Sequence, residues 1–131
     1  MLVLLDSSML MLPLEKRINL IYEFERILSV AFEVVVPQIV LIELEEIKER
    51  GEMATKRKAQ LALNLAMSFR TIESKTEVHV DYELIRLAET HKAVIATNDR
   101  KLRSTLIDKG ISVISLHGEN KLALFGDLSY Q

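Results

Sequence analysis

Short apolar runs alternate along the chain with longer stretches in which apolar residues recur every three or four positions. The short runs are typical of buried strands, and the longer spacing is typical of amphipathic helices. The predicted strands are residues 2–5, 33–36, 71–72, 94–96 and 111–116. The predicted helices are residues 15–31, 38–50, 55–69, 81–91 and the segment after Asp99 that ends at Gly110. Because strands and helices alternate, we expect a parallel, doubly wound α/β sheet.

The same pattern predicts one domain over residues 1–131, a length that can bury a substantial core. No linker, internal repeat or low-complexity segment interrupts it. The chain changes character after Leu116, so we expect residues 117–131 to form a peripheral hairpin or tail. Within it, residues 122–125 would pair with 111–116 across a turn that contains Gly118.

Composition excludes several classes of protein. Hydrophobic residues make up 49% and charged residues 27%, as in ordinary globular domains. The absence of cysteine excludes disulfides, a thiol nucleophile and cysteine-bound metal, and fits a cytoplasmic protein. Asp6 interrupts the apolar start of the chain, and no basic stretch precedes it, so we expect no signal peptide. No apolar run approaches the ~18 residues of a membrane-spanning helix, so we expect no membrane contact. The net charge of −2 leaves only local patches for binding nucleic acid.

Three aspartates stand where an open α/β sheet binds ligands, outside the carboxyl ends of its strands. Asp6 directly follows one predicted strand and Asp99 closely follows another. Asp81 begins a predicted helix, and its place beside the sheet stays open at this point. Each of them taken alone is as well explained as a helix cap. Together they favour a shared acidic site.

Glu43 strengthens that interpretation. It falls on the flank of the helix face that Val40, Leu44 and Ile47 are expected to bury. A carboxylate beside a core is costly unless a cation pairs with it. For an isolated glutamate that cation is usually Lys or Arg, but the nearby acids make a metal ion a competitive explanation. Mg²⁺ or Mn²⁺ prefers oxygen ligands and can activate water for attack on a phosphate, which indicates phosphodiester hydrolysis.

The order of these residues resembles the PIN-domain family from Leu2 to Leu116. The matching segments are LLDSS at residues 4–8, VP at 36–37, IEL at 42–44, Asp81 ahead of a helix, and ATNDR at 96–100. The resemblance implies a three-layer α/β/α sandwich around a central parallel sheet, and an endoribonuclease that depends on Mg²⁺ or Mn²⁺. It implies that the catalytic, metal-binding residues are Asp6, Glu43, Asp81 and Asp99.

The resemblance also suggests residues that support the site. Ser7 and Thr97 take the positions of the family's supporting hydroxyls, whereas Ser8 stands where many members carry Asn, which puts one contact behind the acids in doubt. A basic group directly after Asp99 would hold the RNA backbone: Arg100, Lys101 and Arg103. A second basic run, residues 56–58, is better explained as a solvated helix face.

Two branches of the family fit equally well, nucleases of ribosomal-RNA processing and VapC-type toxins. The expected partners are RNA, an antitoxin or a ribosome-assembly partner, and a second copy in a homodimer. Two other functions remain as alternatives. One is a catalytically silent RNA- or protein-binding scaffold; the other is a phosphatase-like or receiver domain that uses Asp6 as nucleophile, which leaves Glu43 and Asp81 without a role. We expect Glu83 to face solvent, and the three histidines to be surface or structural residues.

Overall fold

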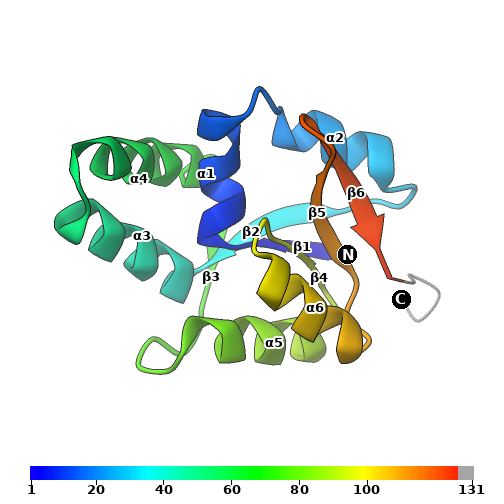
Figure 1. Ribbon diagram of the computed structural model, residues 1–131. Helices are drawn as coiled ribbons and strands as arrows, with labels where there is room; N and C mark the ends of the chain where they lie inside the picture. Colours follow the sequence, from blue (N-terminus) through cyan, green and yellow to red (C-terminus); the bar gives the residue numbers. More distant parts are fainter. Residues whose placement is uncertain (127–131) are drawn as a thin grey trace.

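The computed structural model describes residues 1–126, which form a six-stranded sheet between helices (Figure 1). The strand order is β3–β2–β1–β4–β5–β6, and every neighbouring pair is parallel except the last. The strands are β1 (Leu2–Leu5), β2 (Glu33–Pro37), β3 (Arg70–Ile72), β4 (Val94–Ala96), β5 (Val113–His117) and β6 (Lys121–Phe125). The expected α/β fold with a parallel central sheet is confirmed, with one antiparallel strand added at its edge.

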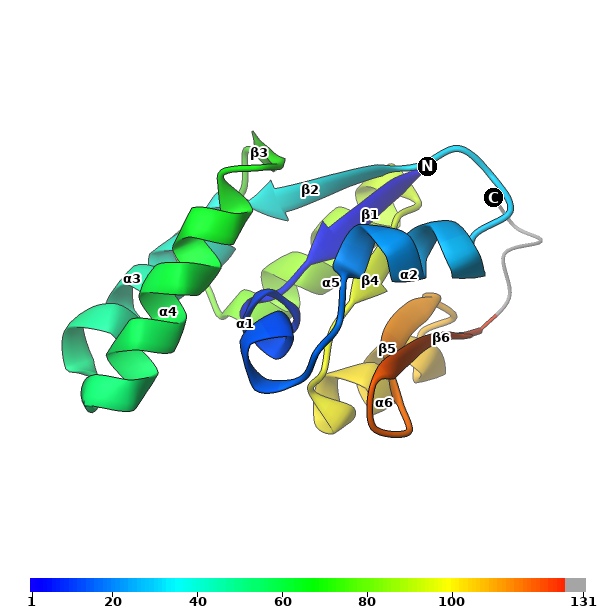
Figure 2. The ribbon, with the colours of Figure 1, turned by 90° about the horizontal axis from the view of Figure 1, so that it is seen from above.

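Six helices cover this sheet. They are α1 (Ser7–Glu15), α2 (Leu20–Ile27), α3 (Gln38–Arg50), α4 (Met53–Ala66), α5 (Val80–His91) and α6 (Arg100–Asp108). In Figure 1, α1, α2 and α4 lie on one side of the sheet, and α5 and α6 lie on the other. Figure 2 shows α3 and α4 side by side as a pair that extends beyond the β3 end of the sheet. The three-layer arrangement brings both helical layers to the carboxyl ends of the strands.

The central strands explain why the sequence folds in this way. The residues of β4 and residues 3–5 of β1 are fully buried, because helices cover both faces of the sheet. Such strands contain only apolar residues, so a polar side chain appears only where the strand stops. Asp6 and Thr97 are the residues directly after β1 and β4, and the Asp6 amide donates to Ala96 O at 3.2 Å. The two strand ends therefore meet.

The predicted helix over residues 15–31 is wrong. Within that range only Leu20–Ile27 is helical beyond Glu15, where α1 ends. An extended Lys16 follows α1, and an extended Asn19 precedes α2. The Asn19 side chain accepts from the Tyr22 amide at 3.0 Å and so starts a new helix. Apolar spacing missed α1, because residues 9–14 are all apolar and include Pro13, so no helical spacing is visible.

The other elements lie close to their expected positions. Residues 38–50 form a helix with the predicted bounds, whereas the helix predicted over 55–69 spans Met53–Ala66. Strand β6 pairs with β5 as expected, with His117 opposite Lys121 beside the turn at Gly118 (φ +77°). The last part of the predicted tail, residues 127–131, lies outside the described residues. Within residues 1–126, no helix is both long and apolar enough to cross a membrane.

Candidate active site

Asp6 is the most buried acid of the site, with 4% of its surface exposed. It is the N-cap of α1, and its Oδ1 accepts from the Met9 amide at 2.8 Å and from Ser8 Oγ at 2.8 Å. Its other oxygen, Oδ2, accepts from Thr97 Oγ1 at the end of β4. Asp6 is therefore a helix cap, and hydrogen bonds fix both of its oxygens.

Ser8 and Thr97 join Asp6 to the loop that carries Asp99. Thr97 Oγ1 accepts from the Asp99 amide at 3.0 Å, and Ser8 Oγ accepts from the Asn98 amide at 2.8 Å. Ser8, at the position where many family members carry Asn, thus contacts both Asp6 and the loop before Asp99 through its hydroxyl. The family resemblance pointed to Ser8 and Thr97, but no local pattern showed that they contact each other's segments, because these are about 90 residues apart.

Glu43 lies on α3, half-buried, where it accepts a hydrogen bond from Ser7 Oγ at the start of α1. Ser7 and Thr97, the two hydroxyls that the resemblance suggested, thus each donate a hydrogen bond to one acid, Ser7 to Glu43 and Thr97 to Asp6. Val40 and Leu44 are buried and Ile47 is half-buried, so Glu43 does sit on the flank of a buried face. No Lys or Arg pairs with it among the ion pairs of residues 1–126.

The last two predicted acids lie at the starts of helices in the layer that faces away from α1. Asp81 is half-buried in the first turn of α5, and its amide donates to His79 Nδ1 at 3.2 Å. Asp99 is exposed and caps α6, with Oδ1 accepting from the Lys101 and Leu102 amides at 2.9 and 3.1 Å. Asp81 interacts electrostatically with Glu43, whereas Asp99 is linked to Asp6 through Thr97.

Burial and mutual repulsion change the acidity of the two inner carboxyls. Burial raises the pKa of Asp6 from 3.8 to about 6, although hydrogen bonds from Thr97, Met9 and Ser8 oppose the rise and the charge of Glu43 adds to it. The pKa of Glu43 is also raised, first by burial and then by the charge of Asp81, against the hydrogen bond from Ser7. The site therefore holds acids that repel one another and are costly to ionise together.

The chemistry of these acids suits a hard divalent cation, since their ligand atoms are all carboxylate oxygens and a neighbouring positive charge would stabilise their ionised forms. Within residues 1–126, however, no three carboxylate or imidazole side chains converge closely enough to hold a metal ion as they stand. Asp6 is fixed by its hydrogen bonds, so the side chains of Glu43, Asp81 and Asp99 would have to turn towards it. The residues present therefore fit the ion by their chemistry and by their position near the carboxyl ends of the strands.

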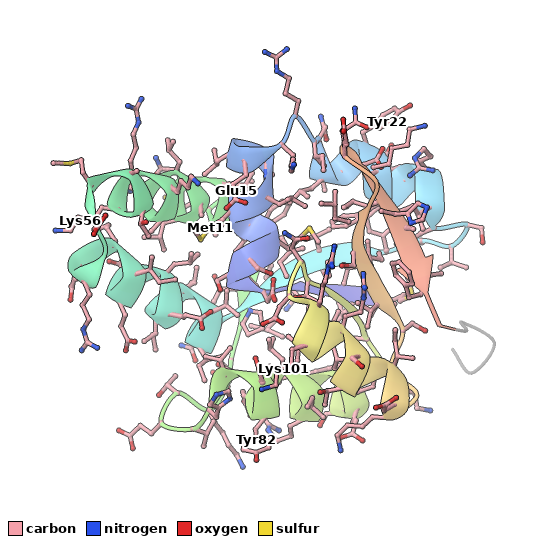
Figure 3. All side chains as sticks on the ribbon, in the orientation of Figure 1. Met11, Glu15, Tyr22, Lys56, Tyr82 and Lys101 are labelled. Carbon is pink, nitrogen blue, oxygen red and sulfur yellow. The ribbon has the colours of Figure 1, made fainter. Side chains whose placement is uncertain are left out.

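The basic residues predicted to bind RNA take different positions. Arg100 and Lys101 are exposed at the start of α6, directly beside Asp99. Arg103 is half-buried, with Cζ 4.7 Å from the centre of the Phe125 ring on β6. Lys56 lies at the far end of the α3–α4 pair from the sheet (Figure 3), as a solvated helix face would. The structure thus brings two cations to the acids and holds a third against β6.

The prediction that Glu83 faces solvent is wrong, since only 1% of it is exposed. Arg86 donates to both of its oxygens at 2.7 Å, and the Lys75 amide donates to Oε2 at 2.6 Å. This pair ties the loop before α5 to the helix that carries Asp81. The i, i+3 spacing of Glu83 and Arg86 was a visible sign of the pair, but not of its burial.

One hollow of the described structure lies away from the acids. It measures about 860 Å³ and lies at the amino end of β2, between α2 and the residues that lead into β3. A smaller pocket of about 240 Å³, between α5 and α6, includes Asp81. The candidate active site is thus an edge of the sheet with one small pocket beside it.

Comparison with known proteins identifies the class. The family model described as PIN like domain matches residues 3–119, so the chain belongs to the PIN-like domain family. The resemblance inferred from its acidic residues is confirmed.

Two individual proteins are similar to the chain over most of its length. Ribonuclease VapC4 of Methanocaldococcus jannaschii is 29% identical over 126 residues, which cover 92% of this chain and 94% of VapC4. The solved structure of the PIN domain endonuclease Utp24 matches with a TM-score of 0.76 at 22% identity, covering 94% of this chain and 90% of the Utp24 chain. The second match confirms the fold.

Proposed function

We propose that this protein is a metal-dependent endoribonuclease that hydrolyses RNA phosphodiester bonds at the sheet edge formed by Asp6, Glu43, Asp81 and Asp99. Asp6 carries the proposal: a buried carboxyl with both oxygens bonded and a pKa raised to about 6, beside a second acid with a raised pKa. Such an arrangement costs stability, and a scaffold has no use for it. Membership of the PIN-like family and the similarity to ribonuclease VapC4 support the same conclusion.

The residues divide into three roles. Asp6, Glu43, Asp81 and Asp99 would hold Mg²⁺ or Mn²⁺, and Arg100 and Lys101 would bind phosphates of the RNA backbone. When bound, such an ion activates water and stabilises charge on the phosphate. Ser7 orients Glu43, and Thr97 and Ser8 orient Asp6, through the hydrogen bonds already described.

The biological setting follows from the relatives. The similarity to VapC4 favours a toxin with an antitoxin partner over a nuclease of ribosomal-RNA processing. The match to Utp24, at 22% identity, supports the fold and does not bear on this choice. The proposal includes a single domain over residues 1–131, a homodimer and a cytoplasmic location, as expected from the sequence.

The test is cleavage of an end-labelled structured RNA by the purified protein, with Mn²⁺ and with EDTA, beside Asp6→Asn. Asp108→Asn is the matched control, because Asp108 is exposed at the end of α6. We expect cleavage that needs the ion, is lost in Asp6→Asn and persists in Asp108→Asn. Equal cleavage by Asp6→Asn would refute the site. RNA binding without cleavage in any condition would favour the silent scaffold.

A further inference from the structure

A small pocket adjoins the candidate active site on the side of Asp81. Its volume is about 240 Å³, and it opens between the first turns of α5 and α6. Figure 3 labels the two exposed side chains that flank it, Tyr82 from α5 and Lys101 from α6. Its lining residues are His79, Asp81, Tyr82, Ile85, Lys101, Leu102 and Thr105. Asp81 lines this pocket and is also one of the proposed metal ligands, so the pocket adjoins the proposed active site.

Two aromatic rings form one side of the pocket. Tyr82 is 75% exposed, and its ring centre lies 5.7 Å from that of His79 in an edge-to-face arrangement. His79 is held in place because its Nδ1 accepts from the Asp81 amide. An Nδ1 that accepts carries no proton, so the ring proton is on Nε2, where it is available to an acceptor on a ligand. The pair therefore offers a free aromatic face and an oriented donor.

The rest of the lining combines an apolar floor with one cation. Ile85 and Leu102 are 9% and 3% exposed, which makes the floor part of the core. The Lys101 side chain is exposed, and its amine takes part in none of the ion pairs found within residues 1–126. Its backbone amide binds Asp99, which places Lys101 beside a second proposed metal ligand.

A nucleotide, with its planar base and its phosphate, matches this lining. Unpaired nucleobases bind proteins by stacking on aromatic side chains, while cations hold the adjacent phosphates. An exposed tyrosine alone would be unremarkable. Here its ring, the His79 donor, an apolar floor and a free lysine surround one cavity that shares Asp81 with the acids.

We propose that this pocket binds the base of an unpaired nucleotide next to the scissile phosphate, stacked on Tyr82 and contacted by His79, with Lys101 at its phosphate. The inference rests on the proposed function and deepens it, because it assigns the lining of this pocket to one unpaired base beside the cut. A base within a continuous duplex stays in its own stack and does not reach the ring.

The first experiment measures kcat and KM for cleavage of a hairpin RNA cut in its loop. Tyr82→Ala should raise KM roughly 5- to 100-fold, as for the loss of one base stack, with a smaller change in kcat. Tyr82→Phe keeps the ring and should restore most of the loss. Tyr22→Ala is the control, because Tyr22 is 64% exposed on α2, on the other side of the sheet.

The second experiment removes the base instead of the ring. Two hairpins each carry one abasic nucleotide, on opposite sides of the cut. One of them should be a poor substrate for the wild type, and on that hairpin Tyr82→Ala should be no worse than the wild type. If both abasic hairpins are cut as well as the intact one, or if Tyr82→Ala leaves KM unchanged, the pocket does not bind a base.

A binding assay separates the failure of the pocket from the failure of the proposed function. A short hairpin RNA with 2-aminopurine in its loop is titrated, in EDTA, with Asp6→Asn protein that either keeps Tyr82 or also carries Tyr82→Ala. A Tyr82-dependent change in fluorescence without cleavage by the wild type would sustain the pocket and refute the nuclease. No Tyr82-dependent change would refute the pocket, whether or not the wild type cleaves RNA.

Discussion

Replacing Asp6 by Asn should make the protein more stable when no divalent ion is present. Asp6 is buried and its pKa is raised to about 6, so its ionised form costs folding free energy above that pH. Asn has nearly the same shape. Its Oδ1 can still accept from Ser8 and Met9, while its amide can donate to Thr97 in place of the bond that Thr97 now donates.

The magnitude follows from the pKa. A rise from 3.8 to about 6 corresponds to roughly 3 kcal/mol at pH 8, since one pKa unit is worth about 1.36 kcal/mol. Reversing the Thr97 hydrogen bond costs on the order of 1 kcal/mol, which leaves a net gain of about 2 kcal/mol. For a chain of this size that gain raises Tm by roughly 6–8 °C.

The sign of the pH dependence is opposite to that of an ordinary ion-paired acid. Because the pKa of Asp6 is higher in the folded state, its penalty is absent below pH 3.8, grows as the pH rises, and is complete above about pH 6. At pH 4.5 only about 1 kcal/mol of the penalty is present, so the advantage of Asp6→Asn should nearly vanish.

The assay is thermal unfolding in a chelator at pH 8 and at pH 4.5, repeated at pH 8 with excess Mn²⁺. Mn²⁺ should raise the Tm of the wild type more than that of Asp6→Asn, because the variant lacks one proposed ligand. Asp108→Asn controls for the loss of a charge and should change stability by less than about 1 kcal/mol. If Asp6→Asn is less stable than the wild type in chelator at pH 8, or if its advantage does not depend on pH, the account of Asp6 is wrong.

Three further substitutions test other parts of the structure. Thr97→Val removes a hydrogen bond that lowers the pKa of Asp6. The acidic limb of the pH–rate profile should therefore move to higher pH, and the rate at neutral pH should fall; an unmoved profile would contradict the role assigned to Thr97. Glu83→Gln should lower the free energy of unfolding at pH 7 by about 1–3 kcal/mol in urea unfolding, whereas exposed Glu89→Gln should have little effect. The loss should be smaller below pH 4, because hydrogen bonds depress the pKa of Glu83 and its contribution disappears as it is protonated. Asn19→Ala should cost about 1 kcal/mol in the same assay through the lost cap of α2, and an unchanged midpoint would show that the cap contributes nothing.

The sequence by itself determined the local features of this protein. A strand buried on both faces must be apolar throughout, so β1 and β4 were visible as apolar runs, and the polar residues Asp6 and Thr97 marked where they end. Helix α3 had its predicted bounds because a proline precedes it and a glycine follows it. The order of acids along the chain was also sufficient to predict the family.

Only the tertiary structure decided features that depend on residues far apart in the chain. The helix predicted over residues 15–31 is shortened to Leu20–Ile27, because α1 ends at Glu15 and the Asn19 cap starts a new helix despite a continuous apolar spacing. Glu83 looked like a surface residue until the loop at Lys75 covered it. The bond between Asp6 and Thr97 joins strands that are distant in sequence and adjacent in the sheet, so no local pattern records it. Burial, and the pKa changes that follow from it, arise only when the whole chain excludes water from these groups.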